Sequence, residues 1–173
     1  CIEDRHPEIE VPAIHTGGWY DILPGGTIRN YLGMKESGAN ETARSGQRLV
    51  IGPWAHGARG STMVGRHYFG IMADPAATDI DGMHLRWFDH WLNDGKNGIT
   101  EEAPVRIFVM GDDVWREEQE WPLARAQESK YYLHSGGKAN STNGDGSLGT
   151  DGPQAEPPDV FLYNPADPVP TTG

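Results

Sequence analysis

Gly-Gly-Trp-Tyr-Asp at residues 17–21 and Gly-Pro-Trp-Ala-His-Gly at residues 52–57 decide the fold of this chain. The first stretch follows the apolar run at residues 11–16, and the second follows the run at residues 49–51. Short apolar runs of this kind, bounded by glycine and proline, are typical of buried strands. Each stretch therefore places one titratable side chain, an acid in the first and a histidine in the second, just past the end of a strand.

The residues between the two stretches predict a helix. Pro24 suits a first helical turn, Ile28, Tyr31 and Leu32 repeat at helical spacing, and Gly38 is a plausible stop. The second strand then follows and is expected to end at a glycine-proline pair. A strand, a helix and a strand in this order predict a parallel βαβ unit with a right-handed crossover.

The strongest helix signal lies further along the chain, and it begins between Asp74 and Gly82. Asp74-Pro75 is a natural cap and first turn, and Asn-Asp-Gly at residues 93–95 ends the helix. We expect its apolar stripe to belong to the core rather than to a substrate cage. The stripe comprises Ile80, Met83, Trp87, Phe88, Trp91 and Leu92.

Beyond Gly95 the pattern changes to strands without intervening helices, which favours an antiparallel sheet of the sandwich or jelly-roll type. The predicted fold class is thus α/β followed by all-β. Residues 1–99 are assigned to the α/β part and residues 100–173 to the β part. Strands are predicted at residues 105–110, 115–121, 129–134 and 159–163, with a short one around Ser147 and Leu148.

The composition excludes several classes of function. The 173 residues carry 14 basic and 25 acidic side chains, a net charge of −11, and no basic cluster, so neither a nucleic acid nor an anionic membrane is an expected partner. No apolar run approaches the roughly 20 residues of a membrane span. The single cysteine allows no internal disulfide, and no His or Cys pair has zinc spacing, so we expect no metal and no cofactor. Localisation and oligomeric state, a homo-oligomer included, remain open.

Asp21 and His56 are the candidate catalytic residues. In open α/β sheets the active groups gather at the carboxyl ends of the strands, and an acid one βα unit before a histidine follows the chain order of α/β-hydrolases. Asp21 would then orient the imidazole of His56, which would act as a general base on a serine. The nucleophile motif Gly-x-Ser-x-Gly does not occur in the sequence. Taken singly, Asp21 is equally readable as a helix-capping turn residue, and His56 as an ordinary loop histidine.

Several motifs, in order and over nearly the whole chain, make it resemble the cocaine esterase / X-Pro dipeptidyl-peptidase family of serine hydrolases. The resemblance implies an α/β-hydrolase domain, a helical cap and a C-terminal jelly roll, with Asp21 as triad acid and His56 as triad histidine. It also implies that the serine and the oxyanion donors lie before Cys1 and that the last jelly-roll strands lie after Gly173. The motifs are those at residues 18–21, 48–57, 85–92, 105–111, 115–116 and 121–122.

The resemblance further implies that the full-length enzyme hydrolyses a small-molecule ester, an amide or a short peptide. The piece described by this sequence would be inactive alone because it lacks the nucleophile. Tyr20, Leu23 and Trp54 flank the triad positions and are candidate substrate contacts. The alternative is a non-catalytic jelly-roll module that binds carbohydrate or is purely structural; its aromatic platform would comprise Trp115, Trp121, Tyr131 and Tyr132.

Overall fold

A computed structural model describes residues 2–57 and 61–169 of the chain. These residues form two compact units, of which the first ends at Ala124 and the second begins at Arg125. Within the described ranges, no helix has both the length and the apolar character needed to cross a bilayer.

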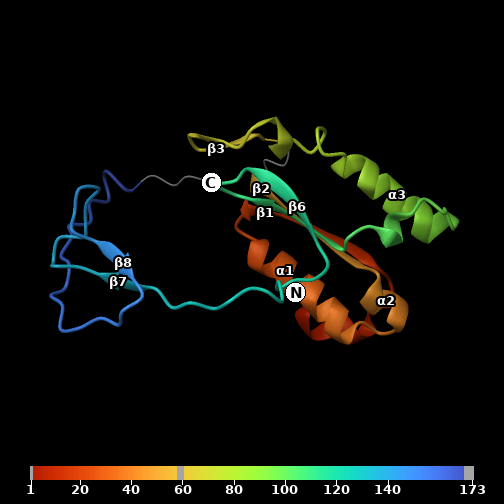
Figure 1. Cartoon of the computed structure of the whole chain (residues 1–173), viewed down its shortest axis with the longest axis horizontal. Coiled ribbons are helices and arrows are strands. Elements are labelled where there is room, and N and C mark those ends of the chain that lie inside the picture. The colour runs from red at the N-terminus through yellow and green to blue at the C-terminus, as the bar shows by residue number, and fades with distance from the viewer. Residues whose placement is uncertain (1, 58–60, 170–173) are drawn as a thin grey trace. The chain divides into compact units, whose positions relative to one another are not determined.

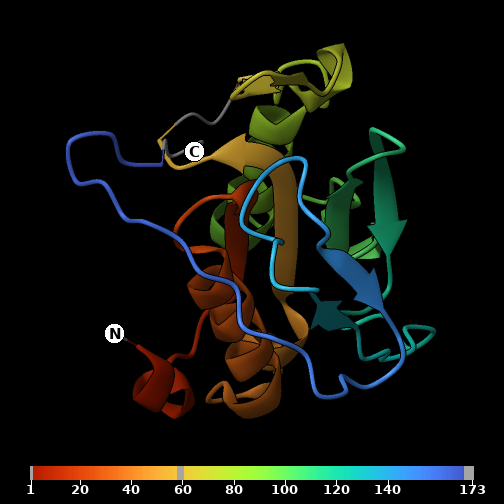
Figure 2. The same ribbon diagram turned by 90° about the vertical axis from the view of Figure 1, so that its left-hand side faces the viewer.

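The first unit is built on a four-stranded sheet with the order β1-β2-β5-β6. β1 lies parallel to β2, β2 lies parallel to β5, and β5 pairs with β6 in the antiparallel sense (Figures 1 and 2). The predicted βαβ unit is present, since helix α1 connects the two parallel strands β1 and β2. The sheet strands are β1 (Ala13–Tyr20), β2 (Gln47–Ala55), β5 (Val105–Val109) and β6 (Val114–Glu118).

Helices and a small hairpin complete the unit. Pro24 opens α1 as predicted, and the backbone N–H of Gly38 closes it on the carbonyl of Met34. Asn40 caps α2 by accepting a hydrogen bond from the backbone N–H of Ala43. The helices are α1 (Pro24–Ser37), α2 (Glu41–Ser45) and α3 (Ile80–Asn93), with 3-10 turns η1 (Glu3–Glu8), η2 (Ile71–Ala73) and η3 (Ile99–Glu101) and the hairpin β3 (Met63–Val64) and β4 (His67–Tyr68).

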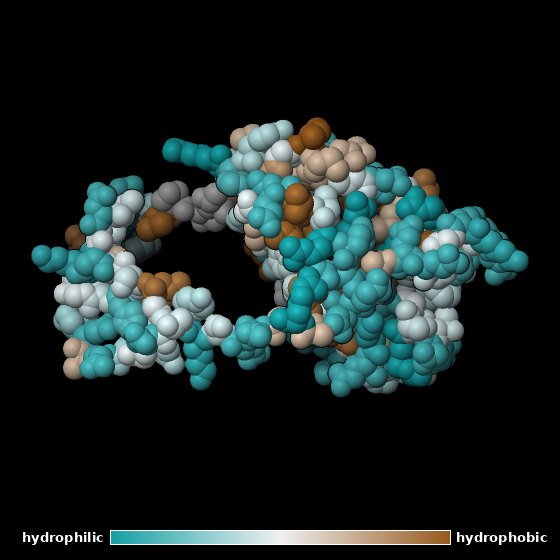
Figure 3. Space-filling view, in the orientation of Figure 1, coloured by the Kyte–Doolittle hydropathy of each residue, from teal (hydrophilic) through white to brown (hydrophobic). Residues whose placement is uncertain are grey.

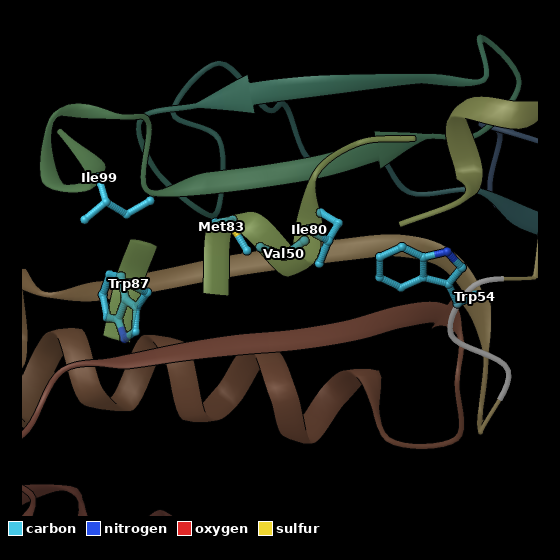
Figure 4. Close-up of a cluster of buried hydrophobic side chains, with 6 residues drawn as sticks. All are labelled: Val50, Trp54, Ile80, Met83, Trp87 and Ile99. Atoms are coloured by element: carbon cyan, nitrogen blue, oxygen red, sulfur yellow. The ribbon is translucent and has the colours of Figure 1, made fainter. Parts of the chain in front are cut away.

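The central strand β2 is buried on both faces, as parallel strands covered by helices usually are. Leu49 and Ile51 pack with Tyr31 of α1 on one face of the sheet. Because side chains alternate along a strand, Val50 points to the other face, where it meets Met83 of α3. Figure 4 shows this second cluster, which comprises Val50, Trp54, Ile80, Met83, Trp87 and Ile99.

Helix α3 is shorter than the longest prediction and buries less of its stripe. It begins at Ile80, because the segment from Asp74 forms separate turns before it. Met83 and Trp87 are buried as predicted, but Phe88 is 55 % exposed and Leu92 is 75 % exposed. The prediction was therefore wrong for these last two side chains, since the helix contacts the core along a narrower line than the full stripe.

Two strands differ from their predicted form. β2 was expected to end at the glycine-proline pair, but it continues through Pro53 to Ala55. The strand β5, expected to open a separate antiparallel sheet, instead joins β2 in parallel, with Leu49 opposite Val105. The indole N–H of Trp19 in β1 also donates to the carbonyl of Phe108 in β5, at 2.7 Å. The first compact unit thus extends past the predicted boundary at residues 99–100, and the residue range of the C-terminal domain stays a prediction.

The second unit contains little regular structure among its described residues. β7 (Tyr132–His134) pairs with β8 (Ser147–Gly149) in the antiparallel sense, which confirms a strand at each of these places. The predicted strand at residues 159–163 is absent; instead, the Asp159 carboxylate accepts hydrogen bonds from the Ser135 hydroxyl and the Ala139 N–H. The jelly roll therefore stays a prediction.

On the face drawn in Figure 3, apolar side chains form small separate patches in a largely hydrophilic surface.

Candidate functional site

The ends of β1 and β2 bring Asp21 and His56 together. Nδ1 of His56 lies 2.9 Å from Oδ1 of Asp21, within the hydrogen-bond reach predicted from the sequence. The same carboxylate oxygen accepts a second hydrogen bond, at 2.8 Å, from the backbone N–H of Leu23 at the start of α1. Asp21 therefore makes the turn contact expected of a helix-capping residue, and it also contacts His56 as an acid–histidine pair requires.

The contact favours one tautomer of the neutral imidazole. A carboxylate oxygen accepts hydrogen bonds, so Nδ1 of His56 is the donor, and in the neutral ring Nε2 then holds the lone pair. The His56 side chain is 54 % exposed and that of Asp21 is 20 % exposed, so the acid is shielded while the imidazole is open to an incoming group. Such a pair can take a proton from a hydroxyl at Nε2 and return it later.

A β-bulge lies directly before this pair. Gly18 of β1 pairs with Gly52 of β2. Two residues later on β1, Tyr20 pairs with Ala55, which lies three residues later on β2. β2 therefore holds one extra residue in this interval. Pro53 stands in it, as expected because a proline within a central strand is tolerated at bulges, where a ladder hydrogen bond is already missing.

The candidate substrate contacts occupy different surroundings. Tyr20 is 39 % exposed, and its ring lies 5.8 Å from the ring of Phe69. Leu23 is 57 % exposed beside the acid. Next to Asp21 lies a cavity of about 150 Å³. It is lined by Thr16, Gly17, Gly18, Asp21, Trp54, Ala55 and Gly57.

The structure does not present the indole of Trp54 beside the pair. Trp54 is 2 % exposed, and its indole N–H donates to the carbonyl of Ala73 at 2.7 Å. Its ring lies 5.7 Å from that of Trp115, which packs against the buried cluster to which Trp54 belongs. Figure 4 shows Trp54 among the members of that cluster. A buried aromatic with a satisfied N–H belongs to the core. Trp54 as a residue still lines the cavity beside Asp21, so its contact with a substrate stays a prediction.

Sequence reasoning missed two contributors to the geometry, the β-bulge in β2 and the ring of Phe69 against Tyr20. The backbone N–H of Leu23 fits the interpretation of Asp21 as a helix-capping turn residue. Of the two missed features, only the bulge left a signal, because a proline within a strand, here Pro53, indicates a bulge.

Two residues of the aromatic platform predicted for the alternative module make other contacts in the structure. The indole N–H of Trp115 donates to the carbonyl of Met72 at 2.6 Å, and Trp121 packs on Trp19 at 6.0 Å. Both tryptophans are thus engaged within the first unit. Over the described residues, no group of three or more His, Cys, Asp or Glu side chains is arranged to hold a metal ion.

The second unit has a pocket of its own. It measures about 620 Å³ and lies around the pair of His134 and Glu156, whose Nδ1 and Oε1 atoms are 2.7 Å apart. The contact with Glu156 raises the pKa of His134 and lowers that of Glu156. Both side chains are partly exposed, His134 at 22 % and Glu156 at 29 %, so solvent screens this ion pair and its contribution to stability is small.

Comparisons with known proteins agree with this architecture. The family model of the X-Pro dipeptidyl-peptidase (S15 family) matches residues 2–58, and that of the X-Pro dipeptidyl-peptidase C-terminal non-catalytic domain matches residues 97–172. Cocaine esterase from Rhodococcus sp. (strain MB1 Bresler) is 37 % identical over 173 residues, which are 98 % of this chain and 28 % of the esterase.

Two solved structures are similar over 98 % of the chain. An α-amino acid ester hydrolase, labelled with selenomethionine, matches with a TM-score of 0.68 at 25 % identity, over 27 % of its own length. An aminopeptidase from the marine sediment archaeon Thaumarchaeota archaeon matches with a TM-score of 0.65 at 22 % identity, over 26 % of its length, which shows the shared fold. The chain thus spans about a quarter of the length of the relatives it matches. By its two successive family matches and its likeness to the esterase, this chain belongs to the cocaine esterase and X-Pro dipeptidyl-peptidase (S15) family.

Proposed function

We propose that this chain supplies the acid and the base of a Ser-His-Asp triad in a full-length serine hydrolase, with Asp21 as the acid and His56 as the base. The observation that carries the proposal is the 2.9 Å contact between His56 Nδ1 and Asp21 Oδ1 at the ends of two parallel strands. Membership of a hydrolase family supports it. The exposure of the imidazole agrees with it, because a base must reach a group supplied from elsewhere.

The proposed chemistry divides the work between the two side chains. Asp21 holds the proton on Nδ1 of His56 and stabilises the imidazolium that forms during the reaction. Nε2 takes the proton of a serine hydroxyl as the hydroxyl oxygen attacks the substrate carbonyl, and then delivers that proton to the leaving alcohol or amine. The serine and the oxyanion donors belong, on this proposal, to the remainder of the longer protein. Without them the present piece performs no acyl transfer.

The proposed substrates are small esters, amides or short peptides. The names of the relatives, cocaine esterase and α-amino acid ester hydrolase, support an ester bond as the target. The match to the X-Pro dipeptidyl-peptidase model supports a peptide bond, which is an amide. Tyr20 and Leu23 stay candidates for apolar contacts with the substrate, since both expose side chains on either side of the acid. The C-terminal segment, matched by a non-catalytic family model, is proposed to be a jelly roll that supports the catalytic part.

Replacing the base tests the proposal. In the full-length enzyme, His56→Ala should lower turnover of a p-nitrophenyl ester by at least about 1,000-fold while circular dichroism stays unchanged. The matched control is His84→Ala, which removes a histidine whose Nδ1 contacts the carbonyl of Ile80 on α3, and which should keep full turnover. Added imidazole should restore part of the activity of His56→Ala and should have no such effect on the control variant. Undiminished turnover by His56→Ala would remove the residue from the proposed role.

A further inference from the structure

The bulge in β2 has a direct consequence for the side chains that follow it. The two strands end at the paired residues Tyr20 and Ala55, so Asp21 and His56 are each the first residue after a strand end. Two parallel strands that end at the same level of the sheet place the residues that follow them close together. Their side chains can therefore meet, as the 2.9 Å contact between them shows.

Without the extra residue the pair would not form. If the pairing of Gly18 with Gly52 simply continued, Asp21 would lie opposite Ala55, and His56 would follow one place later. One place along a strand is a displacement of about 3.3 Å. A displacement of that size exceeds the narrow range of hydrogen-bond lengths, so the 2.9 Å contact between the two side chains would be lost.

The bulge is held from both sides by close contacts. A Cβ added to Gly18 would lie 2.0 Å from the carbonyl oxygen of Trp54 and 2.7 Å from its carbonyl carbon. A Cβ added to Gly52 would lie 2.4 Å from the nearest atom of the Trp54 indole, which folds back over that residue. The indole N–H is in turn anchored on the carbonyl of Ala73. These contacts restrict the backbone of the extra residue in β2 to one position. That position is possible because Gly18 has no side chain.

We propose that the bulge at Pro53 and Trp54, seated against Gly18, sets the register that aligns Asp21 with His56, which makes Gly18 a positioning residue for the acid–base pair. The inference rests on the proposed function of that pair. Gly18 touches no reacting atom; its role is to let the backbone of β2 approach closely enough. An added methyl group lies 2.0 Å from the Trp54 oxygen, and an ordinary contact begins at 3.4 Å, so backbone atoms must move by about 1.4 Å. A misplacement of only about 1 Å can already cost about 100-fold in rate.

The experiment is a double-mutant cycle on kcat in the full-length enzyme with a p-nitrophenyl ester. Gly18→Ala should lower kcat by about 100-fold with KM little changed. In an Asp21→Ala background the same substitution should lower kcat by less than about threefold, because the alignment it disturbs no longer matters. A merely destabilised protein would show the same fall in both backgrounds, and that result would overturn the inference.

Gly46→Ala is the matched control. A Cβ at Gly46 would lie 2.7 Å from the carbonyl oxygen of Thr42, so this substitution also forces backbone atoms apart. Gly46 directly precedes the first residue of β2, at the end of the strand away from the bulge. It should lower the melting temperature and leave kcat unchanged. A fall in kcat equal to that of Gly18→Ala would show that any strain on β2 has this effect, and would also overturn the inference.

A milder variant keeps the inference testable if Gly18→Ala does not fold. Trp54→Phe retains an aromatic ring but deletes the N–H that anchors the bulge on Ala73. It should lower kcat in the native background and not in the Asp21→Ala background; equal effects in both would contradict the proposal. If Asp21→Ala itself leaves kcat unchanged, the proposed function fails. If Asp21→Ala removes activity and neither bulge variant affects kcat, only the register inference fails.

Discussion

Asp21→Asn tests whether the negative charge of the acid matters in addition to its hydrogen bonds. In the structure one carboxylate oxygen accepts from both the backbone N–H of Leu23 and Nδ1 of His56. Because both contacts use the same oxygen, an asparagine can keep both through its single amide oxygen, and Nδ1 of His56 stays the donor. The amide lacks the negative charge that stabilises the imidazolium formed during the proposed reaction.

The expected magnitude follows from the loss of that charge. Two unit charges about 4 Å apart attract each other by about 4 kcal/mol at the effective dielectric constant of about 20 that applies near a protein surface, and this is about 10³-fold in kcat at about 1.36 kcal/mol per tenfold. The free energy of unfolding should change by less than about 1 kcal/mol, since the Leu23 hydrogen bond is kept and the site is partly open. Activity and stability are therefore predicted to separate by several kcal/mol.

The assay compares Asp21→Asn and Asp21→Ala in the full-length enzyme. Burst and steady-state release of p-nitrophenol give the acylation rate and kcat, and urea unfolding gives stability. Asp21→Asn should be less impaired than Asp21→Ala, because asparagine keeps Nδ1 of His56 as the donor while alanine leaves the imidazole free to adopt either tautomer. A fall of less than about tenfold in kcat for Asp21→Asn, with the fold intact, would refute the reasoning.

Three further predictions concern stability. Trp54→Phe should lower the free energy of unfolding by about 1–3 kcal/mol, measured by urea denaturation, because it leaves the carbonyl of Ala73 without its donor. Met83→Ala, at a side chain 2 % exposed, should cost about 2–5 kcal/mol by the same measurement, whereas Phe88→Ala on the open side of α3 should cost less than about 1 kcal/mol; equal losses would contradict the burial described here. Burial lowers the pKa of His15 below its usual 6.5, so the unfolded chain takes up the proton first as the pH falls, and stability should decline from about pH 6.5 downwards. Thermal melts at several pH values should show this decline flattened in His15→Asn, and an unchanged profile would exclude the histidine as its source.

The catalytic end of the fold was readable from local patterns. Apolar runs that stop at polar residues mark buried strands, and the helical spacing between them predicts the parallel unit. Two parallel strands end at the same edge of a sheet, so the approach of Asp21 to His56 follows from their order alone. The hydrogen bond between them needs one thing more, the register, and nothing in the local pattern counts the residues of a bulge.

Pairing between distant segments could not be read from the sequence. A run such as residues 105–109 predicts a strand but not its neighbour, because the choice of β2 depends on which edge the rest of the sheet leaves open. The same limit explains residues 159–163, whose apolar character suits a strand but which find no ladder among the described residues. Trp54 illustrates a third limit: proximity in sequence to His56 does not determine on which side of the strand an indole lies.

The position of β5 bears on how parts can be exchanged between relatives. The segment matched by the non-catalytic family model begins at residue 97, and its first strand is β5. Yet β5 pairs directly with β2, the strand that leads to His56. The indole N–H of Trp19, two residues before Asp21, also donates to a carbonyl of β5. A chimera joined near residue 97 would replace one flank of the histidine-bearing strand together with the C-terminal part. A junction near Ala124, where the first compact unit ends, keeps the sheet of a single parent intact.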